Sequence, residues 1–243
     1  MKKFEQPKLS SGNKAFDEWL NGGYEREVIT CFYGPYATGK TNFCLMALSE
    51  LLKRGKKAIY IDTESSFSFE RLKQIMGNEY KRERLKNVLI FKPTSFKEQI
   101  EVFDKILKLR NFDAIFVDSI GMLYRLELGL LKEEVKEDEK EIEKEKIRKI
   151  NLFLARQLRI LSELARKMKI PIIVTNQVYQ DFEGNIHMVG GDLLKYWSKC
   201  LIQLENLGDK RKAILVKHRY LPQKEFIYRI VERGIEKIRK FLF

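Results

Sequence analysis

The chain has 243 residues, 44% of them hydrophobic and 33% charged, and these proportions suit one ordered α/β domain and exclude a disordered or fibrous chain. Lys and Arg exceed Asp and Glu by 47 to 34, and the net charge of +13 fits a polyanionic partner and simple solubility equally well. The sequence shows no apolar leader and no run of eighteen apolar residues, so we expect neither export nor a membrane span. Cys31, Cys44 and Cys200 form no CxxC pair, and we expect the buried, reduced thiols of a cytoplasmic protein.

A short helix is predicted over 14–20 and a buried strand over 28–33, where the residues are apolar and β-branched. The strand leads directly into GPYATGKT at 34–41, after which apolar residues follow helical spacing. Strand, glycine-bounded loop and helix are the context in which G-x-x-x-x-G-K-[ST] binds phosphate. Backbone N–H groups of such a loop turn inward on phosphate oxygens, and the helix N-terminus adds a favourable field.

The loop predicts a nucleotide site with Mg²⁺. Lys40 would reach the β- and γ-phosphates, and the Thr41 hydroxyl would hold the metal. The simpler alternative is a glycine-rich turn with an exposed lysine. Ala37 stands where many such loops have glycine, and a positive φ there would strain it mildly. The predicted contact residues are Gly34, Pro35, Tyr36, Ala37, Thr38, Gly39, Lys40 and Thr41.

Two carboxylates follow the next predicted strand, which covers 58–62. Asp62 and Glu64 would lie at the carboxyl end of a strand, where open α/β sheets bind their ligands. Glu64 is the candidate that orients and deprotonates an attacking water, since general-base catalysis needs a carboxylate within reach of that water. The alternative is that these residues only cap the helix that begins near Phe67.

A second nucleotide motif follows two βα units later. Strands are predicted over 88–92 and 113–118, with an amphipathic helix that starts at Ser95 between them. The later strand ends in Asp118, which would bind Mg²⁺ through a water.

The middle of the chain is strongly charged. We expect a mobile loop at 126–135 and one long helix that ends near residue 169, with the charged stretch 132–149 as its solvated first turns. Another buried strand ends in Gln177, which would hydrogen-bond the γ-phosphate and report its presence to the loop that follows, 178–191.

The last part of the chain alternates apolar and polar residues. This pattern predicts half-exposed antiparallel strands near 200–204, 213–216 and 226–230. Residues 206–243 hold eleven Lys or Arg against four Asp or Glu, a charge of +7. A basic end on a nucleotide-binding chain suggests a nucleic-acid partner, while the same charge also serves solubility.

The order of motifs resembles one protein family. The motifs occur along the chain as LSSGNKAFDEWLNGG, ITCFYGPYATGKTNFCLMAL, YIDTESSFSFERL, AIFVDSI and IIVTNQV. They look like the ATPase core of archaeal RecA-family recombinases, over about 9–234. The resemblance implies an α/β RecA-like P-loop NTPase core, with a mostly parallel central sheet flanked by helices and antiparallel strands at the C-terminal end. It also implies ATP and Mg²⁺ as ligands and DNA as a partner.

The resemblance gives roles to residues already singled out. Lys40 and Thr41 match the Walker A residues, and Asp118 matches the Walker B aspartate. Glu64 matches the glutamate that activates water. Gln177 matches the residue that couples the γ-phosphate to the DNA-binding loop after it.

Two segments correspond to the family's DNA-contacting loops, roughly 124–131 and 178–191. Tyr179 and Phe182 would stack on bases. The second segment is short and contains two acidic residues, which suit a phosphate backbone poorly.

Several positions depart from the family pattern. Only about eight residues precede the core, so we expect a single ATPase domain over 1–243 without the N-terminal helical domain of full recombinases. Residues 4–7 do not supply the family's Phe-x-x-Ala filament motif. Lys217 and Arg219 stand where recombinases usually have an aspartate-led cap, and they could bind a neighbour's γ-phosphate. Ser68 takes the place of the arginine that stacks on adenine.

The resemblance therefore implies an accessory DNA repair protein that binds ATP·Mg²⁺ and single-stranded DNA, hydrolyses ATP slowly and assists homologous recombination at the nucleoid. A full-length recombinase would be its partner, and self-association is conceivable. Three alternatives stay open: a complete strand-exchange recombinase, a KaiC-like signalling ATPase, and a nucleotide-sensing scaffold for another protein.

Overall fold

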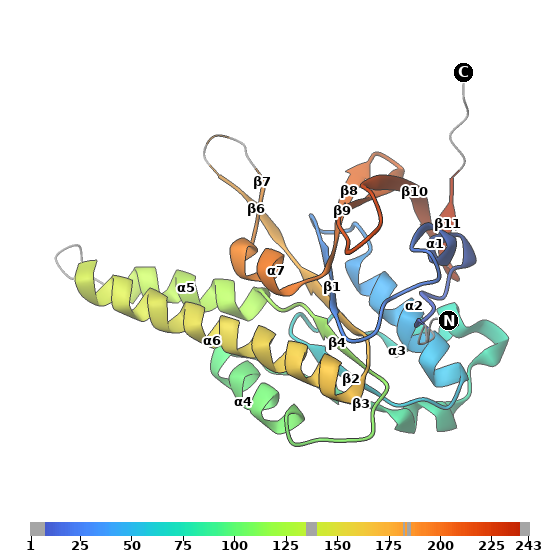
Figure 1. Ribbon diagram of the computed structural model, residues 1–243, viewed down its shortest axis with the longest axis horizontal. Helices are drawn as coiled ribbons and strands as arrows, with labels where there is room; N and C mark the ends of the chain where they lie inside the picture. Colours follow the sequence, from blue (N-terminus) through green and yellow to red (C-terminus); the bar gives the residue numbers. More distant parts are fainter. Residues whose placement is uncertain (1–7, 135–139, 182, 184–185, 239–243) are drawn as a thin grey trace, which may run out of the picture.

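One large twisted sheet runs through the centre of the molecule (Figure 1). The computed structural model describes residues 8–134, 140–181, 183 and 186–238. Within them, nine strands pair in the order β11-β10-β9-β8-β1-β5-β4-β2-β3. The strands are β1 (Ile29–Tyr33), β2 (Ala58–Asp62), β3 (Val88–Phe91), β4 (Ala114–Asp118), β5 (Ile172–Asn176), β8 (Cys200–Leu207), β9 (Lys210–Lys217), β10 (Lys224–Val231) and β11 (Gly234–Lys237).

The sheet has a parallel part and an antiparallel extension. The six strands from β8 to β3 in the sheet order are parallel to their neighbours. Strands β9, β10 and β11 continue from β8 in antiparallel pairs. The predicted α/β core, mostly parallel with antiparallel strands at the C-terminal end, is therefore confirmed.

Helices cover both faces of the sheet. They are α1 (Lys14–Trp19), α2 (Lys40–Lys53), α3 (Phe69–Met76), α4 (Phe96–Ile106), α5 (Met122–Glu134), α6 (Lys140–Met168) and α7 (Gly191–Trp197), with 3-10 turns at Gly77–Glu79 and Arg82–Asn87. Phe32 and Tyr60 pack with α1, α2 and α3, whereas their chain neighbours Cys31 and Ile61 pack with α4, α5 and α6. Successive strand residues point to opposite faces, so the apolar strands bury both faces at once.

Local signals set several helix starts. The Asn13 side chain accepts a hydrogen bond from the Phe16 N–H, so Asn13 is the N-cap of α1. Ser95 caps α4 in the same way, through the Glu98 N–H. Each cap satisfies a backbone donor that the first helical turn leaves without a partner.

The three cysteines are buried and free, as predicted. Burial raises the pKa of Cys200 to about 12, with a smaller opposing effect of the Thr30 hydrogen bond. The thiol therefore stays protonated and behaves as a small apolar side chain.

The prediction of a loop at 126–135 is wrong as far as Glu134, because α5 is helical throughout that stretch. Leu123 and Leu131 are buried on its inner side, and α5 lies alongside α6 in a helical pair that projects from the core (Figure 1). Burial of one apolar face stabilises α5 as a helix where the sequence pattern indicated a loop.

The predicted long helix is confirmed from Lys140 as α6, but residues 132–134 belong to α5. The predicted loop at 178–191 holds an antiparallel hairpin instead, with strands β6 (Val178–Gln180) and β7 (Ile186–Met188). Predictions that concerned residues 4–7, Phe182 and 239–243 lie outside the described residues.

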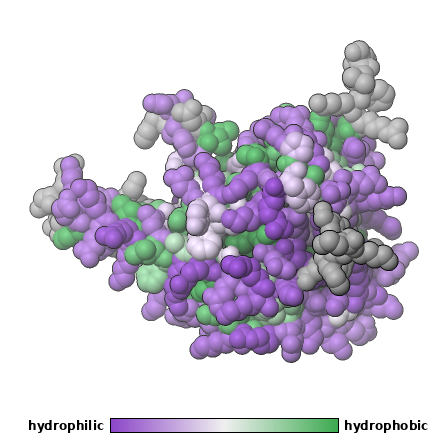
Figure 2. Space-filling model, viewed as in Figure 1, coloured by the Kyte–Doolittle hydropathy of each residue, from purple (hydrophilic) through white to green (hydrophobic). Residues whose placement is uncertain are grey.

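The surface in Figure 2 is mostly hydrophilic, with small hydrophobic areas over α5 and beside β7. Among the described residues, no helix is long and apolar enough to cross a membrane.

Leu158→Ala is expected to destabilise the protein, because Leu158 is fully buried on α6 among the side chains of α4 and α5. The loss in unfolding free energy should be about 2–5 kcal/mol, from lost apolar contact and the cavity left behind. Leu152→Ala on the same helix is the control, since Leu152 is 61% exposed. Denaturant unfolding measures both; similar losses for the two variants would contradict the packing described.

Candidate nucleotide-binding site

A pocket of about 730 Å³ opens at the carboxyl ends of the parallel strands β1, β2, β4 and β5. Parallel strands place the residues that follow them at one edge of the sheet. The pocket lining includes the residues singled out for the site in the sequence except Thr38, Asp62, Lys217 and Arg219. Glu64, Asp118 and Gln177 therefore face the same space as Lys40.

The phosphate loop is tightly packed against the sheet. A Cβ on Gly34 would lie 2.2 Å from the Leu204 carbonyl oxygen, so only glycine fits there. Gly39 has φ +91 and begins α2. Ala37 has φ +60, the positive value that the sequence analysis considered, and an L-residue adopts it at a cost. The Thr38 side chain points away from the pocket, and its hydroxyl donates to the Pro35 carbonyl at 2.8 Å.

Lys40 lies over the loop. Its Nζ donates to the carbonyl oxygens of Gly34, at 2.9 Å, and Pro35, at 2.7 Å. Burial lowers the pKa of Lys40, and the carboxylates of Glu64 and Asp118 partly oppose that shift. The ammonium thus contacts two backbone carbonyls and lies near two acidic side chains, in a position from which it could form charge-assisted hydrogen bonds to a phosphate.

Asp118 is 2% exposed and is surrounded by hydroxyl donors. Its Oδ2 accepts from the Tyr60 hydroxyl and the Ser66 hydroxyl, both at 2.9 Å, and its Oδ1 accepts from Thr175. Burial, together with the Asp118 charge, raises the pKa of Tyr60, so its phenol stays a donor. These bonds fix the Asp118 carboxylate at the pocket floor.

The oxygen atoms of Thr41 and Asp118 fit a magnesium site. Thr41 Oγ1 lies 3.4 Å from Ser66 Oγ, and Ser66 in turn donates to Asp118. One hydroxyl and one carboxylate suit Mg²⁺, which keeps several waters and takes its other ligands from substrate phosphates. Among the described residues, no group of three or more acidic, His or Cys side chains is placed to hold a metal ion.

Glu64 and Gln177 are in direct contact. Gln177 Nε2 donates to Glu64 Oε1 at 2.9 Å, and the Ser119 hydroxyl donates to the same oxygen. Gln177 follows β5, and the neighbouring Asn176 side chain donates to the Val189 carbonyl at 2.7 Å. A short chain of polar contacts therefore joins the candidate base to the end of the β6–β7 hairpin.

Lys217 and Arg219 are not brought to the pocket of their own chain. Lys217 Nζ donates to the Lys195 carbonyl at 2.5 Å, and Arg219 Nε pairs with Glu25 at 3.1 Å. A contribution to a neighbouring subunit's site stays a prediction.

Arg71 is a pocket residue that the sequence analysis missed. Its Nη2 donates to Asn42 Oδ1 and to the Val231 carbonyl, each at 2.7 Å. Ser68, the residue at the expected adenine-stacking position, instead caps α3 by accepting from the Arg71 N–H at 3.1 Å. Arg71 stands one helical turn after Ser68, and this spacing was the available signal.

Arg125 also lines the pocket, and its guanidinium carbon lies 6.0 Å from the Tyr179 ring centroid. Arg125 lies in 124–131, a segment that resembles a DNA-contacting loop, but no motif singled it out, and the structure places it in the first turn of α5. The pair places a positive charge and an aromatic face at the pocket mouth, beside Gln177.

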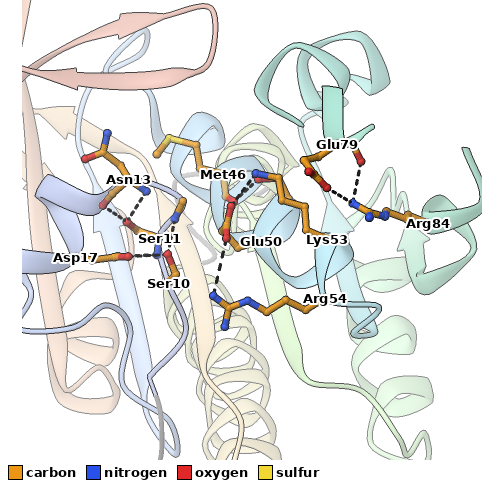
Figure 3. A network of polar contacts seen from close by, with 12 residues as sticks. Ser10, Ser11, Asn13, Asp17, Met46, Glu50, Lys53, Arg54, Glu79 and Arg84 are labelled. Atoms are coloured by element: carbon orange, nitrogen blue, oxygen red, sulfur yellow. Dashed lines mark hydrogen bonds and ion pairs between the residues drawn. The ribbon is translucent and has the colours of Figure 1, made fainter. Parts of the chain in front are cut away.

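A second hollow, of about 670 Å³, lies beside α1 (Figure 3). Asp17 there accepts from the Ser10 hydroxyl at 2.6 Å, and Glu50 pairs with Lys53 at 2.8 Å. Both carboxylates are engaged by residues close to them in the chain, Asp17 by Ser10 and Glu50 by Lys53, so these contacts are structural ones within each segment.

Lys40→Ala is expected to weaken MgATP binding by roughly tenfold or more, since charge-assisted hydrogen bonds to phosphate each contribute about 1.5–3 kcal/mol. Titration calorimetry measures the change. Lys53→Ala is the matched control, because Lys53 lies on the same helix and pairs with Glu50 at the surface. Equal affinities of the two variants would contradict the assignment of the loop.

Known proteins resemble this chain along almost its whole length. The Rad51 family model matches residues 2–238. A DNA repair and recombination protein RadB of Methanococcus maripaludis strain C7 is 41% identical over 225 residues, which are 92% of this chain and 98% of that protein. The RadB of Methanocaldococcus jannaschii is 42% identical over 223 residues, 91% of this chain and 98% of that one.

A solved structure, the crystal structure of the RadB recombinase, superimposes with a TM-score of 0.74 at 37% identity. It covers 95% of this chain and 100% of its own. The match in sequence and the match in fold are thus both to proteins named RadB. The chain belongs to the Rad51 family of RecA-type proteins, in its RadB branch.

Proposed function

We propose that this protein binds ATP·Mg²⁺ and DNA, hydrolyses ATP slowly and assists homologous recombination during DNA repair, as one ATPase domain working in the cytoplasm at the nucleoid. The names of its relatives support the biological setting, since they are DNA repair and recombination proteins. The observation that carries the biochemical part is the pocket in which Lys40, Glu64, Asp118 and Gln177 meet one phosphate loop.

Each residue has a distinct task in this proposal. Lys40 would exchange its bonds to the Gly34 and Pro35 carbonyls for phosphate oxygens. Thr41 and Asp118 would hold Mg²⁺, which neutralises phosphate charge when bound. Glu64 would orient and deprotonate the attacking water.

The contacts of Glu64 support slow hydrolysis. One of its oxygens already accepts from both Gln177 and Ser119. These donors compete with an attacking water for that oxygen, and the remaining lone pairs of the carboxylate would orient and deprotonate the water. Release of Glu64 by Gln177, when Gln177 bonds to the γ-phosphate, would couple the nucleotide to the hairpin.

The β6–β7 hairpin is the proposed DNA contact. Tyr179 is 43% exposed and stacks on His187 with ring centroids 5.5 Å apart. Arg125 lies beside it on α5. Aromatic faces with nearby positive charge are the elements with which proteins bind single strands without sequence preference.

Self-association is a second candidate feature, for the positions of Lys217 and Arg219. Both lie outside the pocket lining of their own chain, and the Arg219 side chain is half exposed beside Glu25. In an assembly of copies they would meet a neighbour's phosphates.

Assays of strand exchange and of protein phosphorylation separate the remaining possibilities. Stimulation of a full-length recombinase supports the accessory role, exchange by this chain alone supports a complete recombinase, and phosphorylation of protein in hexamers supports a KaiC-like ATPase.

Glu64→Gln is expected to lower ATP hydrolysis by about 10²–10⁴-fold, because the amide keeps the shape but cannot take a proton. MgATP affinity should stay within about threefold of the parent value. Phosphate release and calorimetry give the two numbers. Hydrolysis unaffected by the substitution would exclude Glu64 as the base.

Tyr179→Ala is expected to weaken binding of a fluorescent single-stranded oligonucleotide by roughly tenfold, the contribution of about one stacked base. Anisotropy titrations at several salt concentrations should show affinity falling steeply as salt rises, because phosphate contacts release counterions. Tyr220→Ala is the matched control, since Tyr220 is 52% exposed and lies on another loop. Salt-independent binding, or none in the presence of ATP, would refute the DNA role.

A further inference from the structure

The antiparallel extension touches the back of the phosphate loop. Three side chains donate to three successive loop carbonyls: Asn206 Nδ2 to Tyr36 O at 3.2 Å, Arg211 Nε to Ala37 O at 3.1 Å, and Tyr228 OH to Thr38 O at 2.7 Å. None of the three donors belongs to the sequence motif, and they come from β8, β9 and β10.

The three donors form one row across the extension. Asn206 pairs with Arg211 in the β8–β9 register, and Arg211 pairs with Tyr228 in the β9–β10 register. Residues directly opposite each other in antiparallel strands point to the same face of the sheet. The row therefore presents three donors side by side to three consecutive carbonyls of the loop.

The three donors bind a stretch of backbone whose conformation is unfavourable in energy. Ala37 has φ +60, and an L-residue there needs support from its surroundings. Carbonyls turned outward to the row leave the opposite face of the loop, with its N–H groups, free for phosphate. Tyr228 is fully buried, and burial raises its pKa, so the phenol keeps its proton and remains a donor.

We propose that Asn206, Arg211 and Tyr228 are positioning residues for the triphosphate, holding the phosphate loop in its binding conformation before the nucleotide arrives. The inference rests on the proposed nucleotide binding. A loop ordered in advance loses less conformational entropy when it binds, so the row contributes to affinity without touching the ligand.

The test compares Arg211→Gln, and Arg211→Gln combined with Tyr228→Phe, with the parent protein. MgATP affinity by calorimetry should fall about threefold in the first variant and roughly tenfold in the second. Arg229→Gln is the matched control, because Arg229 adjoins Tyr228 on β10 but pairs with Glu236. Its affinity should match that of the parent. Affinities unchanged in all variants of a parent that binds ATP would overturn the proposal.

Amide hydrogen exchange of the nucleotide-free protein separates positioning from general stability. Exchange at residues 36–39 should quicken in the variants while amides within β8, β9 and β10 keep their rates. Uniform acceleration across these strands, or unchanged exchange at 36–39, would refute the positioning role. This measurement needs no ligand, so it decides the inference even if the parent fails to bind ATP, a result that would instead refute the proposed function.

Discussion

Parallel pairing of β1, β2, β4 and β5 is the constraint on which the site depends. Asp62 stands opposite Asp118 in the β2–β4 register, and Tyr33 stands opposite Asn176 in the β1–β5 register. The residues just beyond these pairs are the phosphate loop, Glu64 and Gln177. A shift in register would separate them, so the packing of apolar strand residues on both faces also sets the chemistry at the edge.

A buried carboxylate in this place requires its own support. Asp118 is almost inaccessible, and an unpaired charge there would cost far more than the few kcal/mol by which a domain is stable. Three hydroxyls from β2, the following turn and β5 supply that support. The same bonds hold the carboxylate at the edge of the candidate nucleotide pocket.

The contacts of Glu64 connect the site to the β6–β7 hairpin. Gln177 donates to Glu64, and the preceding residue, Asn176, donates to the Val189 carbonyl at the base of the β6–β7 hairpin. A ligand that draws the Gln177 side chain away from Glu64 would disturb both Glu64 and the hairpin. From the antiparallel extension, Arg211 and Tyr228 donate hydrogen bonds to carbonyl oxygens of the phosphate loop.

The sequence by itself determined the loop at 34–41, the strands that end at Asp62 and Asp118, and the helix start at Ser95, because these depend on local spacing and local hydrogen bonds. The positive φ of Ala37 was considered from the sequence only as a condition, and the structure established it. Only the tertiary structure decided that α5 is a helix, that Arg71 faces the pocket, and that Asn206, Arg211 and Tyr228 meet the loop. These facts rest on contacts between segments up to 190 residues apart, such as Tyr228 and Thr38, and no local pattern encodes which distant side chain satisfies a given carbonyl.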